Sequence, residues 1–215
     1  MTKCAIKNLN PGDRFGYGMK SAIVLDKMDN GVLCMVVDEN YQCRFDKNRS
    51  NNFAESTLRT ELNAHYMRQW IDEGANSRDF VEMEVDLTAD DGIDDYGTCT
   101  CFFAPRTCDQ HRKYRKLIPN CDDWEFTATP YSVKSNGGFC YVRGVRADGS
   151  RNADNAGVAS WVRPLSKLKP DAEVEVEIDA TNSVEESSLM DDMRKLVNEH
   201  GFPEVMETLA KVIAG

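Results

Sequence analysis

Three apolar runs near the start of the chain have the length and composition of β-strands. They are AIKNL (5–9), SAIVLDKM (21–28) and VLCMVVDE (32–39), separated by the turn sequences NPGD and DNG. Asp-Asn-Gly between two β-rich runs is a strong hairpin signal. Residues 1–46 are therefore predicted to form an N-terminal β part.

The apolar period changes to that of a helix after Asn51. Glu55 or Ser56 stands near the expected start, and large side chains recur at near-helical spacing. These side chains are Phe53, Leu58, Leu62, Tyr66 and Trp70. The pattern predicts an amphipathic helix whose aromatic face packs into the core.

Residues 80–165 return to short strand-like runs separated by Gly, Pro and Asp. AEVEVEIDA (172–180) then alternates strictly, with small or apolar residues at even positions from Ala172 and acids between them. Such alternation predicts a strand with one buried and one solvated face.

The last 33 residues form a separate unit, 183–215, predicted as a helical hairpin. Ser183 and Glu186 fit a capping box, Gly201 ends the first helix and Pro203 begins the second. The apolar side chains expected to make contacts are Leu189, Met193, Leu196, Val205 and Leu209. A unit this short needs a surface to cover it, which is its own domain, a second copy in a homodimer, or a protein partner.

Composition limits the class of function. The 215 residues carry a net charge of −10, which argues against binding duplex nucleic acid but allows an acidic surface to bind a basic protein. No apolar run approaches the ~20 residues of a membrane helix, and the first residues lack a signal core. We therefore expect a cytoplasmic protein without membrane contact.

Eight cysteines raise the question of disulfides or metal. Without an export signal, free thiols in a reducing compartment are the expectation. The alternative is zinc, held by Cys99, Cys101, Cys108 and His111, although the spacing lacks two C-x2–4-C pairs. Cys99 and Cys101 would share one face of a strand. The prediction is that the chain binds no metal and no cofactor.

No catalytic motif stands out. A G-x-S-x-G elbow and a phosphate-binding loop are missing from the sequence, and the acid-rich stretches at 85–95 and 148–154 do not match calcium-loop spacing. Both stretches are expected to be exposed turns. His65, His111 and His200 are expected to be solvated, so no catalytic residue is predicted.

Five motifs in order carry a family resemblance. They are LNPGDRF, NNFAESTLRTELN, VDLTADDGIDDYG, RKYRKLIPNCDDWEFTATPYS and WVRPLSKLK, between residues 9 and 169. The chain resembles an uncharacterised domain family of bacteria and phages with a C-type-lectin-like fold, the group that includes formylglycine-generating enzymes. This resemblance implies an α+β domain over 1–180 with short antiparallel sheets and long loops. It also implies that DDWEFTATPYS (122–132) holds a core strand, with Trp124 and Phe126 pointing inward and Pro130 ending the pairing.

The fold so implied places variable loops on one face, and residues 133–158 have a suitable composition. The expected binding residues are Tyr141, Arg143, Arg146, Arg151, Asn152, Asn155 and Trp161. An ordinary exposed hairpin is the competing interpretation. The expected function is a non-enzymatic binding module, encoded by a phage or mobile element and acting in the host cytoplasm. Alternatives are an acidic inhibitor of a host defence complex, of CRISPR or nuclease type, and a formylglycine-generating-like oxidase.

Overall fold

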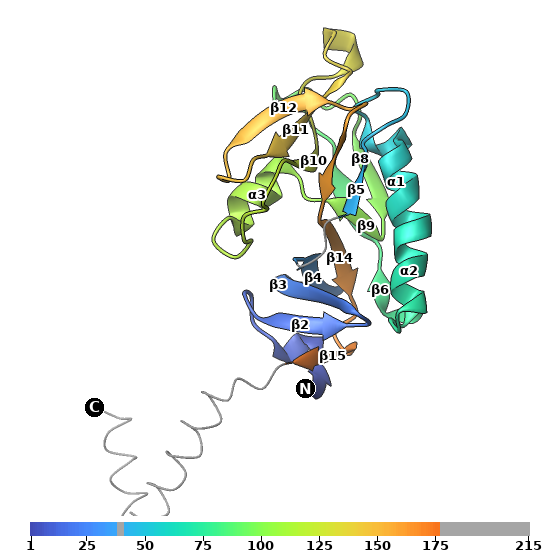
Figure 1. The fold of residues 1–215 in the computed structure, drawn as a ribbon, viewed down its shortest axis with the longest axis vertical. Helices are drawn as coiled ribbons and strands as arrows, with labels where there is room; N and C mark the ends of the chain where they lie inside the picture. Colours follow the sequence, from blue (N-terminus) through green and yellow to red (C-terminus); the bar gives the residue numbers. More distant parts are fainter. Residues whose placement is uncertain (38–40, 177–215) are drawn as a thin grey trace, which may run out of the picture. The chain divides into compact units, whose positions relative to one another are not determined.

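The computed structural model describes residues 1–37 and 41–176, and contacts group Lys3–Val176 into one compact unit. The fold is α+β and mostly antiparallel sheet, with two larger sheets, one two-stranded sheet and a helix along one side (Figure 1). The predicted helical hairpin over 183–215 and its contact residues lie outside the described residues. No helix within the described ranges is long and apolar enough to cross a membrane.

The first sheet is built around the predicted N-terminal hairpin. Its strands, in spatial order, are β1 (Thr2–Ala5), β15 (Glu173–Val176), β2 (Arg14–Tyr17), β3 (Lys20–Met28), β4 (Gly31–Val36), β14 (Pro164–Leu168) and β6 (Phe80–Val81), with β9 (Phe103–Pro105) also on β14. Met28 pairs with Gly31 across the Asp-Asn turn, which confirms the hairpin. In β15, Glu173 is exposed and Val174 fully buried, as the alternation predicted, whereas Glu175 and Val176 are both half-buried. Residues 177–180 of the predicted strand lie outside the described residues.

The predicted strand at 5–9 is wrong. β1 ends at Ala5, and η1 (Ile6–Asn8) is a 3₁₀ turn. The reason is long-range bonding, because the Ile6 and Lys7 amides donate to the carbonyls of Ala172 and Pro170 at 2.9 and 3.0 Å. The chain therefore turns where local propensity favoured extension.

The second sheet carries the C-terminal motifs. Its order is β12 (Arg151–Asn155), β11 (Tyr141–Val145), β10 (Glu125–Pro130), β13 (Ala159–Val162) and β5 (Tyr41–Arg44). Only the β10–β13 pair is parallel among the pairs described in this sheet. The two-stranded sheet consists of β7 (Met83–Asp86) and β8 (Thr98–Cys101), joined by the loop 87–97.

The predicted amphipathic helix is confirmed. It runs through η2 (Phe53–Glu55), α1 (Thr57–Glu61), a π-helical turn η3 (Leu62–Tyr66) and α2 (Met67–Asp72). Its five predicted core side chains are all at most 1% exposed. Ser56 caps it by accepting from the Arg59 amide at 3.0 Å, as Ser residues favour at this position.

Asn63 accounts for the π-helical turn. Its side-chain amide donates to the Arg59 carbonyl at 2.9 Å and to the Phe103 carbonyl at 2.8 Å. Its oxygen accepts from the amides of Phe102 and Phe103 at 2.8 and 3.0 Å. The Asn63 side chain thus bonds a carbonyl within the helix, that of Arg59, and also bonds the helix to β9. A side chain inserted into the helical hydrogen-bond ladder in this way widens the turn.

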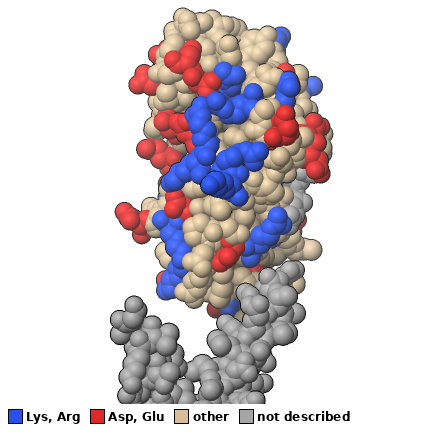
Figure 2. Space-filling view, turned by 90° about the vertical axis from the view of Figure 1, so that its left-hand side faces the viewer, with Lys and Arg blue, Asp and Glu red and all other residues tan. Residues whose placement is uncertain are grey.

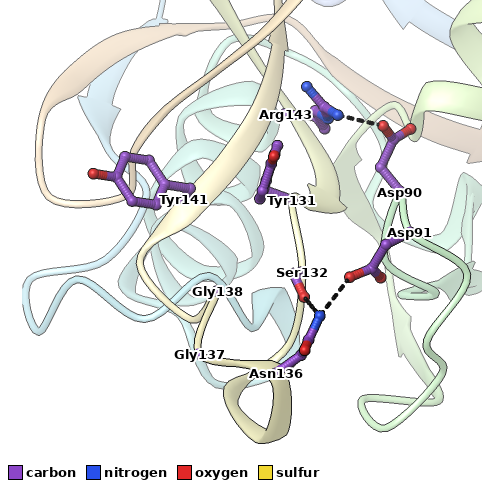
Figure 3. A pocket seen from close by; sticks show the side chains of 9 residues that line it. All are labelled: Asp90, Asp91, Tyr131, Ser132, Asn136, Gly137, Gly138, Tyr141 and Arg143. Atoms are coloured by element: carbon purple, nitrogen blue, oxygen red, sulfur yellow. Dashed lines mark hydrogen bonds and ion pairs between the residues drawn. The ribbon is translucent and has the colours of Figure 1, made fainter.

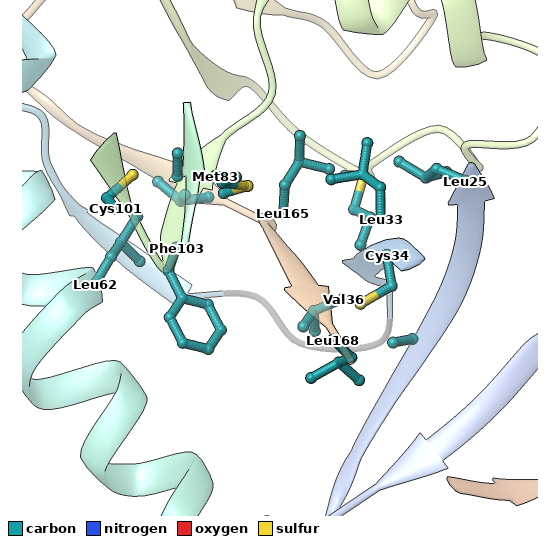
Figure 4. Packing of buried hydrophobic residues seen from close by; sticks show 14 of the residues in the cluster. Leu25, Leu33, Cys34, Val36, Leu62, Met83, Cys101, Phe103, Leu165 and Leu168 are labelled. Atoms are coloured by element: carbon teal, nitrogen blue, oxygen red, sulfur yellow. The ribbon is translucent and has the colours of Figure 1, made fainter. Parts of the chain in front are cut away.

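The hydrophobic core extends from the helix across Phe103 of β9 to β14 and β4 (Figure 4). All six residues of β4 and all five of β14 are buried. Trp70, Phe80 and Phe103 pack with ring centroids 5.1–5.3 Å apart, within the range of favourable aromatic pairs. This packing joins the helix to β6 and β9 of the first sheet.

A short helix in the region predicted to be loops and strands was missed. α3 (Cys108–Tyr114) begins with a reciprocal capping box between Thr107 and Gln110. The 3₁₀ turns η4 (Ser77–Asp79) and η5 (Lys134–Asn136) complete the described elements. The Thr-x-x-Gln spacing was the available signal for α3.

Candidate functional site

The candidate site is an open pocket of about 450 Å³ at the end of the second sheet (Figure 3). It is formed by the loop 87–97, the segment after β10 and the start of β11. Its lining residues are Asp90, Asp91, Tyr131, Ser132, Asn136, Gly137, Gly138, Tyr141 and Arg143. Tyr131 and Tyr141, which line it, are 45% and 47% exposed. Large aromatic rings left in solvent around one hollow are typical of contact surfaces.

Asn51 fixes the backbone of this pocket. The side chain is fully buried, and its amide nitrogen lies 2.7–2.9 Å from the carbonyl oxygens of Ser132, Gly138 and Tyr141. Its oxygen accepts from the Tyr96 hydroxyl at 2.9 Å. One amide therefore joins the segment 131–141 to the loop 87–97, and both walls of the pocket are positioned by a residue that ligands cannot reach.

Two glycines allow the segment to close on itself. Gly137 has a φ of 74°, in the left-handed region that glycine adopts without steric cost. A Cβ on Gly138 would lie 2.4 Å from Cβ of Ser132. Any larger residue at 138 would push the two arms of the segment apart.

Arg143 is the central cation of the site. Its guanidinium lies 2.6 Å from the Asp90 carboxylate and 4.5 Å from the centroid of the Tyr131 ring. The Tyr131 and Tyr141 rings meet edge to face at 6.5 Å. Stacking and ion pairing hold Arg143 in one orientation and stiffen the exposed rings.

Asp90 forms ion pairs with three arginines that come from three different segments. Besides Arg143 on β11, Arg151 on β12 approaches it at 3.1 Å and Arg112 on α3 at 3.4 Å. Asp90 also lines a second cavity of about 450 Å³ beside Cys108 and Thr129. This carboxylate is the electrostatic anchor that joins hairpin, helix and loop.

Asp91 is ionised and held in place. The Ser132 hydroxyl lowers the pKa of its carboxyl, and Asn136 donates to it at 3.3 Å. Its other oxygen accepts from the Ile93 amide at 3.3 Å. The pocket therefore presents a fixed negative group opposite Arg143.

A buried ion triad supports the site from below. The Arg106 guanidinium contacts Glu125 at 2.6 and 3.1 Å, and Arg163 contacts the same carboxylate at 2.8 Å. All three side chains are at most 3% exposed. Although burial raises it, the two arginines hold the pKa of Glu125 below its usual value. The triad carries a net positive charge inside the protein.

His111 lies next to this triad and is buried, so the prediction that it is solvated is wrong. Burial first, and then the Arg106 charge, lowers the pKa of His111 to about 4. Its Nε2 lies 3.4 Å from the Gly149 carbonyl. The ring is neutral at neutral pH, chiefly because it is buried and also because Arg106 lies near it.

The stretch 122–132 joins the support to the site. All six residues of β10 are buried, and Glu125 among them is covered by its arginines. Phe126 points into the core as predicted, but Trp124 precedes the strand and is half-buried. Its indole lies against Gly144, where a Cβ would approach within 2.4 Å. The strand ends at Pro130, and Tyr131 enters the pocket.

The structure brings together only part of the predicted binding set. The region 133–158 is largely the β11–β12 hairpin rather than a long loop. Tyr141 and Arg143 line the pocket, and Arg151 reaches the same Asp90. Arg146 is exposed at the hairpin turn, where its carbonyl accepts from the Gly149 amide at 2.8 Å.

Asn152, Asn155 and Trp161 have other surroundings. Asn152 lies opposite Gly144, on the face of the hairpin away from Arg143 by strand alternation. Asn155 accepts from Arg49 at 3.3 Å and from the Gly157 amide at 2.9 Å. The Trp161 indole donates to Asp123 at 3.2 Å. These three residues do not line the described pocket.

The cysteines are free thiols in this structure. Cys99 and Cys101 share the buried face of β8, as predicted, while Cys108 and His111 belong to α3. Within residues 1–37 and 41–176, no group of three or more potential ligand residues is placed to hold a metal ion. The alternative zinc set is therefore not assembled.

Sequence reasoning missed Asn51, Asp90 and Tyr131. Asn51 and Tyr131 stand inside two of the motifs quoted above, and Asp90 stands inside a third. The roles of Asn51 and Asp90 depend on partners more than 50 residues away, such as Tyr141 for Asn51 and Arg143 for Asp90. Tyr131 contacts Tyr141 and Arg143, which lie 10 and 12 positions further along the chain. Comparison with known proteins adds no information, because no family model, curated protein or solved structure matches this chain.

Proposed function

We propose that this chain is a non-enzymatic binding module whose recognition surface is the pocket around Tyr131, Tyr141 and Arg143. The observation that carries the proposal is a pair of half-exposed tyrosine rings, Tyr131 and Tyr141, lining a pocket whose backbone is fixed by buried Asn51. Tyrosine and arginine are enriched among residues that dominate binding energy, and a preformed surface loses little entropy on association.

The finer parts of the proposal rest on the sequence motifs. We keep a C-type-lectin-like fold, and an origin in a phage or mobile element, as proposals. The antiparallel sheets and the supporting helix are compatible with a rigid body that presents a variable face.

The test is recovery of a binding partner from host lysate by the immobilised full chain. Tyr131→Ser/Tyr141→Ser should lose the partner while keeping its melting temperature within a few degrees. Met19→Ser/Met28→Ser is the control, because both methionines are exposed and lie outside the pocket, Met19 in the turn between β2 and β3 and Met28 at the end of β3. Equal recovery by the tyrosine variant and the wild type would contradict the proposal.

Inhibition of a host defence complex is the second candidate, and charge favours it. Residues 177–215 contain nine acidic and three basic residues, a net charge of −6, which leaves −4 for residues 1–176. Such an inhibitor would occupy a nucleic-acid groove of its target. Activity of the purified complex on its nucleic acid, with and without this chain, separates the two candidates.

We also propose a homodimer formed through the C-terminal segment, on the strength of its sequence alone. Light scattering should give a dimer for the full chain and a monomer for Leu196→Asp and for a chain ending at Ala180. A full chain that is monomeric at high micromolar concentration would exclude this pairing.

A further inference from the structure

A cluster of basic side chains adjoins the candidate site on an otherwise acidic protein. Figure 2, which views the side of the molecule that carries α3, shows Lys and Arg gathered in a band with acidic groups beside it. The α3–hairpin surface is defined here by six exposed or half-exposed residues: Arg112, Lys113, Arg115, Lys116, Arg146 and Arg151. Four come from α3 and the residues after it, and two from the β11–β12 hairpin.

Contacts between the two elements hold this surface in one arrangement. Arg115 packs on the hairpin turn so closely that a Cβ on Gly149 would collide with its guanidinium. His111 contacts the Gly149 carbonyl at 3.4 Å, and Arg112 and Arg151 share Asp90. The cations are therefore presented by packed elements, and their relative positions are set before any partner arrives.

The charges of this surface are only partly neutralised. Lys113 pairs with Asp26 at 2.7 Å, and Arg112 and Arg151 pair with Asp90. Among the residues that the structure describes, Arg115 and Lys116 have no ion pair.

Arg146 is the third such cation at this surface. It has no ion pair within the described ranges. Its charge helps to lower the pKa of the nearby Asp148 carboxyl. Arg115, Lys116 and Arg146 thus offer unused positive charge at the junction of α3 and the hairpin turn.

We infer that the α3–hairpin surface binds an acidic segment of a protein partner. Three unused cations match a short run of Asp or Glu side chains, and guanidinium groups suit carboxylates. Duplex nucleic acid fits poorly, because its uniform charge would meet the acidic remainder of a −10 chain. The inference rests on the proposed function and adds the chemistry of the partner. The same partner would also contact the neighbouring pocket around Tyr131 and Tyr141.

The experiment measures binding of a fluorescent twelve-residue Glu/Asp-rich peptide to the full chain by anisotropy. Arg115→Ser/Lys116→Ser/Arg146→Ser should bind about tenfold more weakly, and the wild-type affinity should fall when salt rises from low to physiological strength. Lys47→Ser/Arg68→Ser/Arg78→Ser is the control, because it removes the same charge from exposed positions outside this surface. The control should bind within twofold of wild type.

Three outcomes would overturn the inference. They are absence of peptide binding, equal loss in both triple variants, and preference for a 20-base-pair duplex over the peptide. Failure of the proposed function is distinguishable, because that is read from the tyrosine variants. If a lysate partner depends on Tyr131 and Tyr141 but the acidic peptide does not bind, the proposed binding function is supported and only the inference of an acidic partner is wrong.

Discussion

At the scale of single residues, the most consequential side chain is Glu125, the shared carboxylate partner of two buried arginines. An unpaired buried charge costs far more than a lost surface pair, because the protein interior solvates it poorly. The bidentate contact to Arg106 and the further bond to Arg163 show how completely this carboxylate is used.

Glu125→Gln should therefore lower the free energy of unfolding by about 3 kcal/mol. Urea titration at pH 7 measures the loss. Glu82→Gln makes the same change at an exposed position and should cost under about 0.5 kcal/mol. Similar values for the two variants would mean that the arginines find other compensation.

His111 should make the fold sensitive to mild acid. Its pKa is lowered from 6.5 to about 4 in the folded protein, so the unfolded chain binds the proton first as pH falls. Stability contributed by the neutral ring is complete above pH 6.5 and is lost between pH 6.5 and 4, by about 2–3 kcal/mol in all. Glu125 adds to the loss only below its ordinary value of 4.5.

The measurement is urea unfolding at pH 7, 6 and 5 for wild type and His111→Gln. In His111→Gln the free energy of unfolding should depend much less on pH between 7 and 5. In His65→Gln, a change at an exposed position, the dependence should be that of the wild type. A wild-type stability that is flat from pH 7 to 5 would contradict burial of a neutral ring.

At the scale of elements, the segment 131–141 depends on a residue from another part of the chain. Asn51→Ala removes the amide that binds the Ser132, Gly138 and Tyr141 carbonyls. Hydrogen exchange of amides in 131–141 should become at least tenfold faster, since each such bond contributes about 1 kcal/mol. Asn52→Ala is the matched control, because the Asn52 side chain accepts from the nearby Ala54 amide and, within the described residues, makes no bond to the segment 131–141.

The elements that the sequence predicted well are those whose signals are local. The helix over 53–72 follows from five spaced apolar residues and a Ser cap, and the β3–β4 hairpin from an Asp-Asn-Gly turn. The site could be predicted only in part. The composition of residues 133–158 was enough to predict Tyr141, Arg143 and Arg151 as binding residues. Asp90, which pairs with the two arginines from 53 and 61 positions away, follows only from the fold.

At the scale of the whole molecule, burial sorts the thiols into two groups. Cys4, Cys43 and Cys140 are half-buried, and the other five are buried. Burial raises the pKa of Cys43 to about 12, which suppresses its thiolate.

A thiol reagent at pH 8 should therefore label two cysteines quickly in the native protein, Cys4 and Cys140. After denaturation without oxidation it should label all eight. Mass spectrometry of the quenched reaction identifies the sites. Rapid native labelling of Cys34 would show that the core opens far more often than its complete burial implies.

The position of β14 also has a consequence for synthesis on the ribosome. This strand pairs with β4, β6 and β9, and its Ser166 bonds Cys34 from 132 positions further along the chain. Translation adds roughly 5–20 residues per second, so β14 is synthesised on the order of ten seconds after β4. Until then, the edge of β4 that pairs with β14, whose residues are all apolar, has no partner strand. During that interval the nascent chain exposes a strand that could pair with another polypeptide, so cellular yield should depend on holding chaperones more than the finished fold suggests.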